Sequence, residues 1–201
     1  ESSLRRVFHS PVVHEASPVL APETPLEMNF GLCPVACPFK DGAFYDPKDN
    51  LFKLWYHAGW FDGTALATSQ DGLNWERPDL GIEPGTNRVL PLRPQYQRDG
   101  AGVWLDLETE LSEERFKMFA YHRKRGEGFT YGQLGGPRGA GGVRDIPDDW
   151  QGGHVYSSPD GIHWKERQPT GKGGDNTTIF YNPFRKRWVY SVRTSEPSVG
   201  R

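Results

Sequence analysis

A unit of similar sequence occurs three times in this chain of 201 residues, and it constrains the fold more than any other feature. The copies read "KDGAFYDPKDNLFKLWYHAG" from Lys40, "RDGAGVWLDLETELSEERFKMFAYHR" from Arg98 and "GDNTTIFYNPFRKRWVYSVR" from Gly174. Each copy has an aspartate before a small or polar residue, then a short apolar run, a turn, and a second strand with aromatic and basic residues. Because recurring units pack against their neighbours, the sequence predicts a row of small β-sheets.

A second motif, Ser-x-Asp-Gly-x-x-Trp, follows the paired strands of the first two units. It occurs in "ATSQDGLNWERP", residues 67–78, and in "YSSPDGIHWKER", residues 156–167. An aspartate followed by glycine suits a tight turn, because the carboxylate accepts backbone N–H bonds and glycine adopts a positive φ. We therefore expect a structural turn here, with Trp75 and Trp164 packed back on the sheet.

These patterns predict an all-β fold in which each unit is a four-stranded antiparallel blade of a β-propeller. The predicted parts are a lead-in and possible closing strand (1–38), blade 1 (39–97), blade 2 (98–172) with a Gly-rich insertion (124–153), and the start of blade 3 (173–201). Two to three blades do not close a ring, and open edge strands are a liability. We therefore expect the chain to be a fragment of a longer protein.

The composition argues against several classes of partner. A formal net charge of -2 gives no electrostatic reason to bind nucleic acid. No apolar run approaches the roughly 20 residues of a membrane-spanning helix, so no membrane partner is expected. The chain starts at Glu1 rather than at Met, which suits a processed secreted protein or a shortened chain. The expected location is secreted or periplasmic.

The residues that commonly bind metals are not spaced as a metal site. Cys33 and Cys37 have no second cysteine pair and no nearby histidine that would complete a zinc site. We therefore expect no metal and no cofactor. Three single histidines are expected to form hydrogen bonds at strand ends instead: His57, His122 and His154.

Several segments together resemble a known family. "HEASPVLAP" (14–22), "GAFYDPKDNLFKLWYHAG", "LATSQDGLNWERPDLG" and "GDNTTIFYNP" are similar to the five-bladed β-propellers of glycoside hydrolase families 32 and 43, above all to bacterial family-32-like relatives. The resemblance extends from about His14 to Arg193. It implies a five-bladed propeller, of which this chain covers two to three blades. It also implies an enzyme that cleaves glycosidic bonds in plant or algal oligosaccharides and polysaccharides, with a carbohydrate substrate.

The resemblance implies an acidic pocket on the propeller axis, lined by the first strand of each blade. By position, Asp41 takes the role of base or nucleophile, and Asp99 stabilises the transition state or tunes the acid. Asp175 stands at the equivalent point of the third unit, and Glu196 is the candidate proton donor. Glycoside cleavage needs such a pair of carboxyl groups, and carboxylates gathered together raise a pKa.

The chain also departs from the family. It has "KDGAFYDP" in place of the family-32 signature Asn-Asp-Pro-Asn-Gly, and "RDGAGVWLD" in place of Arg-Asp-Pro. Cleavage of sucrose or fructans is therefore not expected. The resemblance in fold does not depend on these signatures.

Four further residues are candidates for substrate binding. Trp60 and Trp150 stand in predicted loops, where an indole ring can stack on the apolar face of a sugar. Arg98 and Arg193 flank the repeated aspartates and can bind hydroxyl groups or a carboxylate. The alternative for each arginine is an ion pair with the neighbouring aspartate.

Two other interpretations remain at this point. The protein can be a non-catalytic carbohydrate-binding propeller, in which the acids bind sugar hydroxyls or a cation. It can also be a sialidase-like propeller, because the Asp-Gly-x-x-Trp turns are similar to sialidase Asp boxes. The spacing between Ser and Trp is one residue shorter than in those boxes, and no arginine triad can be assembled from the sequence. The sialidase interpretation is therefore disfavoured.

Overall fold

The computed structural model describes residues 4–29, 33–60, 63–90, 96–124, 152–171, 173–174 and 176–193. Apart from two short helical turns, the regular elements of these residues are all β-strands. The elements are α1 (Pro25–Met28), β1 (Ala36–Asp46), β2 (Leu51–Ala58), β3 (Gly63–Ser69), β4 (Arg88–Leu90), β5 (Tyr96–Leu105), η2 (Ser112–Glu114), β6 (Phe116–Lys124), β7 (Gly152–Ser158), β8 (Lys165–Gly171), β9 (Thr178–Asn182) and β10 (Arg187–Ser191). No helix among these residues is long and apolar enough to cross a membrane.

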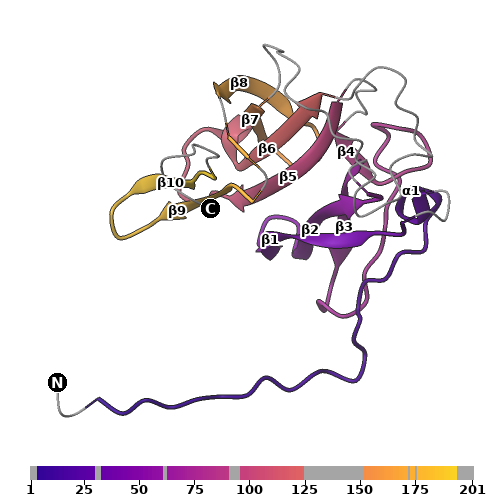
Figure 1. Cartoon of the computed structure of the whole chain (residues 1–201), viewed down its shortest axis with the longest axis horizontal. Helices are drawn as coiled ribbons and strands as arrows, with labels where there is room; N and C mark the ends of the chain where they lie inside the picture. The colour runs from indigo at the N-terminus through magenta and orange to yellow at the C-terminus, as the bar shows by residue number, and fades with distance from the viewer. Residues whose placement is uncertain are drawn as a thin grey trace.

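The strands form three antiparallel sheets that follow one another along the chain (Figure 1). Sheet 1 has the order β1-β2-β3-β4, sheet 2 has the order β5-β6-β7-β8, and sheet 3 consists of β9 and β10. The first strands of the sheets are neighbours, because β1 contacts β5 and β5 contacts β9. The predicted four-stranded antiparallel units are confirmed for the first two copies. The number of blades and the closure of a ring remain predictions.

An apolar core lies between sheet 1 and sheet 2. Trp55 of β2 is 1% exposed, and its ring centroid lies 5.4 Å from that of Phe116 at the start of β6. The other buried members of this core come from both sheets: Phe39, Leu66, Val89, Leu90, Ala101, Val103, Leu105, Met118, Ala120 and Tyr156. Burying a large apolar side chain contributes about 2 kcal/mol, so this core fixes the two sheets against each other.

The Ser-x-Asp-Gly-x-x-Trp motif forms the predicted tight turn in both copies. In the first copy the Ser69 hydroxyl accepts bonds from the N–H groups of Asp71 and Gly72, at 3.2 and 2.8 Å. Gly72 has a φ of 75°, and Trp75 Nε1 donates to its carbonyl oxygen at 3.1 Å. The carboxylate of Asp71 accepts the next N–H groups of the turn, so its polar atoms are used structurally.

The second copy of this turn also joins the two sheets. Trp55 Nε1 of sheet 1 donates to the carbonyl oxygen of Gly161 at 2.9 Å. A Cβ atom at Gly161 would overlap the Trp55 ring, whereas one at Gly72 would meet no atom within 4 Å. The two turns thus have the same local structure, but in this chain only the one at Gly161 is packed under an indole ring.

The lead-in segment reaches sheet 1 through a buried glutamate. Glu27 of α1 has no exposed surface, and its carboxylate accepts hydrogen bonds from the Tyr56 hydroxyl at 2.6 Å and from Arg77 Nε at 2.7 Å. The residues before α1 form an extended segment without regular secondary structure that leads away from the sheets (Figure 1). Phe8 in this segment is 84% exposed.

Candidate active site

Two of the predicted catalytic acids, Asp41 and Asp99, are among the described residues, and both lie at bulges in neighbouring strands. The pairing of β1 with β2 shifts between Pro38 and Ala43, and that interval contains Asp41. The pairing of β5 with β6 shifts between Arg98 and Gly100, which leaves Asp99 as the extra residue. Bulges re-aim a side chain and are frequent next to active sites. In both four-stranded sheets, therefore, the repeated aspartate lies at a β-bulge in the first strand of the sheet.

The carboxylate of Asp41 reaches across to sheet 2. Its Oδ2 atom accepts a hydrogen bond from the backbone N–H of Val103 in β5, at 2.8 Å. A Cβ atom at Gly102 would lie 2.7 Å from the same oxygen, so a side chain there would push the Asp41 carboxylate out of its present position. Burial raises the pKa of Asp41 to about 6, although the Val103 bond and the charge of Lys40 oppose that rise.

Asp99 lies among cations. Its Oδ2 atom is 2.9 Å from Arg123 Nε of β6, and the side chain is 9% exposed. Burial raises the pKa of Asp99, while the positive charges of Arg123 and Arg193 oppose the rise. Arg193 was a predicted site residue. Arg123 was not, because its place beside Asp99 depends on the register of β5 with β6, which no sequence pattern reveals.

The predicted residue Arg98 is placed inside the protein. It is 5% exposed and lies near enough to His57 of β2 for its charge to act there. Burial, together with that charge, lowers the pKa of His57 to about 3. The ring centroid of His57 lies 4.7 Å from that of Phe39 in an edge-on contact. His57 is therefore neutral at physiological pH.

The other two single histidines have hydrogen-bond partners. His122 Nε2 lies 3.1 Å from the Tyr156 hydroxyl, and His154 Nδ1 lies 2.8 Å from a carboxylate oxygen of Glu166. These contacts agree with the expected hydrogen-bonding role. Within the described part of the chain, no group of three His, Cys, Asp or Glu side chains could hold a metal ion.

Several predicted site residues are not brought into this arrangement. Asp175, Glu196 and Trp150 lie outside the described residues. Trp60 is half-buried in the turn after β2, beside the start of β1, where Gly59 N–H donates to the carbonyl oxygen of Val35 at 2.9 Å. A stacking role for Trp60 remains a prediction.

A cavity of about 460 Å³ lies elsewhere, between the outer part of sheet 2 and β10. Phe119, Val155 and Tyr190 are among its lining residues, and neither Asp41 nor Asp99 is. The candidate acids thus belong to the first strands and not to this cavity.

The arrangement allows proton transfer near neutral pH. A carboxyl group with a pKa of about 6 is ionised at pH 7 and is still a strong enough base to accept a proton. Asp99 adds a second, nearly buried carboxyl group on the neighbouring strand. Acid–base or nucleophilic cleavage of a glycosidic bond also uses two carboxyl groups.

Comparisons with known proteins identify no family. No protein-family model matches the chain, and no curated protein sequence matches it. Among solved structures, one similar chain is an N-acetylgalactosamine deacetylase from F. plautii in complex with blood group B trisaccharide, at 16% identity, a TM-score of 0.42 and 74% coverage of this chain. Another is an E230A fructofuranosidase from Schwanniomyces occidentalis complexed with fructosylnystose, at 16% identity, a TM-score of 0.47 and 77% coverage.

The chain corresponds to only part of each of those two proteins. It spans 37% of the deacetylase chain and 28% of the fructofuranosidase chain. At this identity and these TM-scores, neither likeness assigns a family or an activity.

Proposed function

We propose that this chain is part of a glycoside hydrolase with a β-propeller fold, which cleaves glycosidic bonds in plant or algal oligosaccharides and polysaccharides. The observation that carries the proposal is the placement of Asp41 and Asp99 at bulges in adjacent first strands, with Asp41 held across the sheets by Val103. The sequence resemblance supports the same class of enzyme. A secreted or periplasmic location is part of the proposal.

In this proposal Asp41 is the base or nucleophile. It is ionised above about pH 6, and its hydrogen bond to Val103 N–H fixes the direction of the carboxylate. Asp99 supports the developing positive charge on the sugar ring or tunes the proton donor. The donor itself comes from the third unit, with Glu196 or Asp175 as the candidates. Trp60 and Trp150 are proposed to stack on the sugar.

The test is release of reducing sugars by the complete natural protein from arabinans, xylans, fructans and aryl glycosides. Asp41→Asn removes the ionisable group and retains an oxygen that can accept the Val103 bond, so we expect a loss of about 100-fold or more in kcat/KM. In the wild type, kcat/KM rises as the pH passes about 6, because Asp41 must be ionised. Glu110→Gln, an exposed carboxyl-to-amide change in the β5–β6 connection, is the matched control.

Two outcomes would contradict the proposal. Undiminished turnover in both Asp41→Asn and Asp99→Asn would show that these carboxyl groups are not the reacting pair. Saturable binding of glycans without any bond cleavage would favour the alternative, a non-catalytic carbohydrate-binding propeller.

A further inference from the structure

Sheet 1 contacts sheet 2 through a lysine and a tryptophan of β2. Lys53 Nζ lies 5.0 Å from the ring centre of Phe116 in β6 and donates to the carbonyl oxygen of Asp160 at 3.2 Å. Trp55 packs against the same Phe116 ring and donates to the carbonyl oxygen of Gly161 at 2.9 Å. The contact therefore has two parts on sheet 2, the start of its second strand and its Asp-Gly turn.

The residues that make this contact have equivalents one sheet further along the chain. The segment "FKLW" of β2 corresponds to "FKMF" of β6. In both segments the lysine pairs with the aspartate that ends or follows the first strand of its own sheet, at 2.9 Å and 2.8 Å. Lys117 is therefore the equivalent of Lys53, and Phe119 is the equivalent of Trp55.

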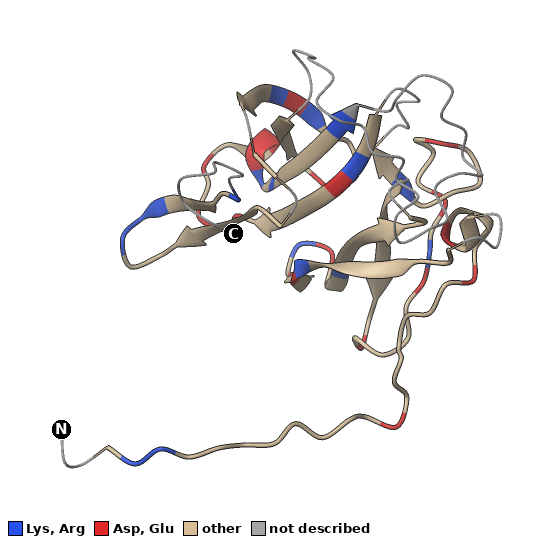
Figure 2. Ribbon diagram, in the orientation of Figure 1, with Lys and Arg blue, Asp and Glu red and all other residues tan. Residues whose placement is uncertain are grey.

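The first part of the contact recurs between sheet 2 and sheet 3. Lys117 Nζ lies 5.2 Å from the ring centre of Trp188 in β10, and the Phe119 ring centroid lies 6.4 Å from that of Tyr190. Figure 2 shows basic residues at the tip of the β9–β10 hairpin, which suits that tip to solvent. Within the described part of the chain, sheet 3 has no counterpart of the Asp-Gly turn.

This face of sheet 2 is more exposed than the equivalent face of sheet 1. The Lys53 side chain is 4% exposed, and that of Lys117 is 19% exposed. Leu66 of β3 has no exposed surface, whereas Val155, at the same place in β7, is half-buried. Cavities of about 460 and 270 Å³ lie along the face, and Val155 and Tyr190 line both. The second contact therefore has room for a further element.

We propose that this face is the docking site of a third Asp-Gly turn, carried by a strand that follows β10 in the complete protein. Lys117 donates to a carbonyl oxygen of that turn, as Lys53 does at Asp160, and the glycine of the turn packs under Phe119. Phe119 has no indole N–H, so the bond that Trp55 makes has no equivalent there. The inference rests on one premise of the proposed function, that the chain is part of a longer protein, and not on the proposed activity.

The first test is the sequence of the reading frame after Arg201. Leu51 and Arg187 are equivalent, because each pairs with the last residue of the preceding strand. We expect a third Ser-x-Asp-Gly-x-x-Trp motif whose serine is as far from Arg187 as Ser69 is from Leu51, apart from any inserted loop. A reading frame without such a turn, whether it stops or continues, overturns the proposal.

Cysteine labelling of the complete protein then tests whether the face is covered. Cys33, Cys37 and any later cysteines are first replaced by serine. Val155→Cys is compared with Leu111→Cys in the β5–β6 connection, where Leu111 is 51% exposed. With a water-soluble maleimide at pH 7, we expect Val155→Cys to react at least about tenfold more slowly, because the reagent reaches it only when the turn opens.

Displacing the turn identifies it as the cover. Replacing the glycine of the third motif by alanine should raise the labelling rate of Val155→Cys about threefold to tenfold, because the added Cβ forces the turn away from Phe119. Gly72→Ala is the matched control and should leave that rate unchanged, since its turn belongs to sheet 1. Ala101→Cys, in the core between sheets 1 and 2, should stay unreactive and so show that the fold is retained.

Three outcomes would overturn the inference. Val155→Cys that reacts as fast as Leu111→Cys would show that nothing covers the face. Slow labelling that the glycine substitution leaves unchanged would show that another segment covers it. Equal increases at Val155→Cys and Ala101→Cys would show that the turn supports the whole fold rather than this face. None of these results bears on the hydrolase proposal, which release of reducing sugars tests separately.

Discussion

Asp41 is held in a position that disfavours its charged form. Burial raises its folded-state pKa to about 6, above the usual value near 4 of an unfolded chain. The folded protein therefore binds more protons than the unfolded one between these values, and the free energy of unfolding falls as the pH rises from about 4 to 6. Active sites often sacrifice stability for activity, so this shift fits the role proposed for Asp41.

Asp41→Asn is therefore expected to stabilise the protein at pH 7. The pKa shift corresponds to a larger free energy, but solvent screens the half-buried carboxyl, so we expect a gain of about 1–2 kcal/mol. Urea unfolding at pH 7 and at pH 3 measures it, and the gain should nearly vanish at pH 3, where the wild-type carboxyl is mostly protonated in both states. A variant less stable than the wild type at pH 7 would contradict the prediction.

Asp46 is the opposite case, a buried acid stabilised in its charged form. Its side chain has no exposed surface and pairs with Lys53 at 2.9 Å and with Arg115, the residue between η2 and β6. Burial works against the charge, but hydrogen bonds from Arg115 and Lys53 hold the pKa of Asp46 well below its usual range. The ion pairs therefore add stability above about pH 4, and this stability is lost as the pH falls further.

Asp46→Asn is expected to lower the free energy of unfolding by about 3–5 kcal/mol at pH 7, because Lys53, itself 4% exposed, loses its buried carboxylate. Asp49→Asn is the matched control. Asp49 also pairs with Lys53 but is 41% exposed, so its loss should cost less than about 1 kcal/mol. Similar losses for the two variants in urea unfolding at pH 7 would argue against a special role for the buried pair.

At the level of elements, the two Ser-x-Asp-Gly-x-x-Trp turns provide an internal comparison. Gly72 and Gly161 have φ values of 75° and 81°, so alanine is strained at both positions by about 1–2 kcal/mol. Only at Gly161 would the added Cβ also overlap Trp55. We expect Gly161→Ala to cost about 2–3 kcal/mol more than Gly72→Ala, because the turn must move away from the indole ring.

Thermal or urea unfolding of the two variants measures this difference directly. The shared backbone strain cancels between them, so what remains is the packing of the turn on sheet 1. The ultraviolet tryptophan emission should also change in Gly161→Ala alone, because Trp55 Nε1 donates to the carbonyl oxygen of Gly161. Equal destabilisation would mean that the contact between Gly161 and Trp55 contributes nothing to stability.

The same turns show what the sequence can and cannot predict about an element. The Asp-Gly pair predicts the turn because its hydrogen bonds run between residues two or three apart, as at Asp160 with Ile162 and His163. The docking partner, Trp55, lies 106 residues away along the chain. Nothing in the local pattern distinguishes the docked turn from the exposed one, because docking depends on how the sheets pack.

At the scale of the whole molecule, the repeat predicts two four-stranded sheets because alternating strands and turns recur with the same order. It also points to Asp41 and Asp99, since the repeat places them alike. It does not predict the bulges, the close approach of Asp41 to Gly102, or the ion pair with Arg123. Those features depend on register and on contacts between sheets, which are set by tertiary packing rather than by local pattern.

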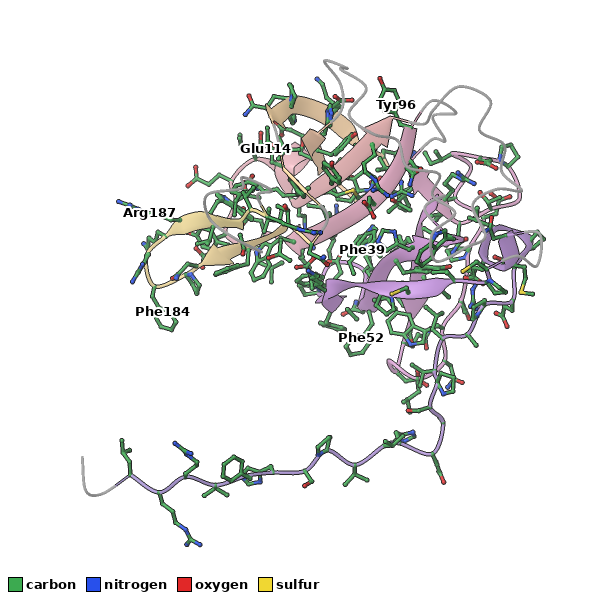
Figure 3. The ribbon with its side chains drawn as sticks, in the orientation of Figure 1. Phe39, Phe52, Tyr96, Glu114, Phe184 and Arg187 are labelled. Atoms are coloured by element: carbon green, nitrogen blue, oxygen red, sulfur yellow. The ribbon has the colours of Figure 1, made fainter. Side chains whose placement is uncertain are left out.

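The three sheets should also differ in local stability, that is, in the free energy needed to open each sheet. The β2 and β6 strands are central in four-stranded sheets and carry the buried core, whereas β9 and β10 form a two-stranded sheet. In the hairpin, Phe184 is 97% exposed and extends into solvent (Figure 3), and Tyr190 is 44% exposed. Two strands with one covered face are marginally stable.

Hydrogen–deuterium exchange of the 201-residue chain is expected to show this difference. Amides of β2 and β6 should exchange at least about 100-fold more slowly than those of β10, because the outer sheet opens without unfolding the core. If the chain is part of a longer propeller, as proposed, strands that follow β10 extend sheet 3 there, and its protection should then approach that of sheet 2. Equal protection of β10 and β6 in the isolated chain would show instead that sheet 3 is already covered, by its own chain or by a second copy. Measuring exchange at two protein concentrations separates those cases, since only a second copy makes the protection depend on concentration.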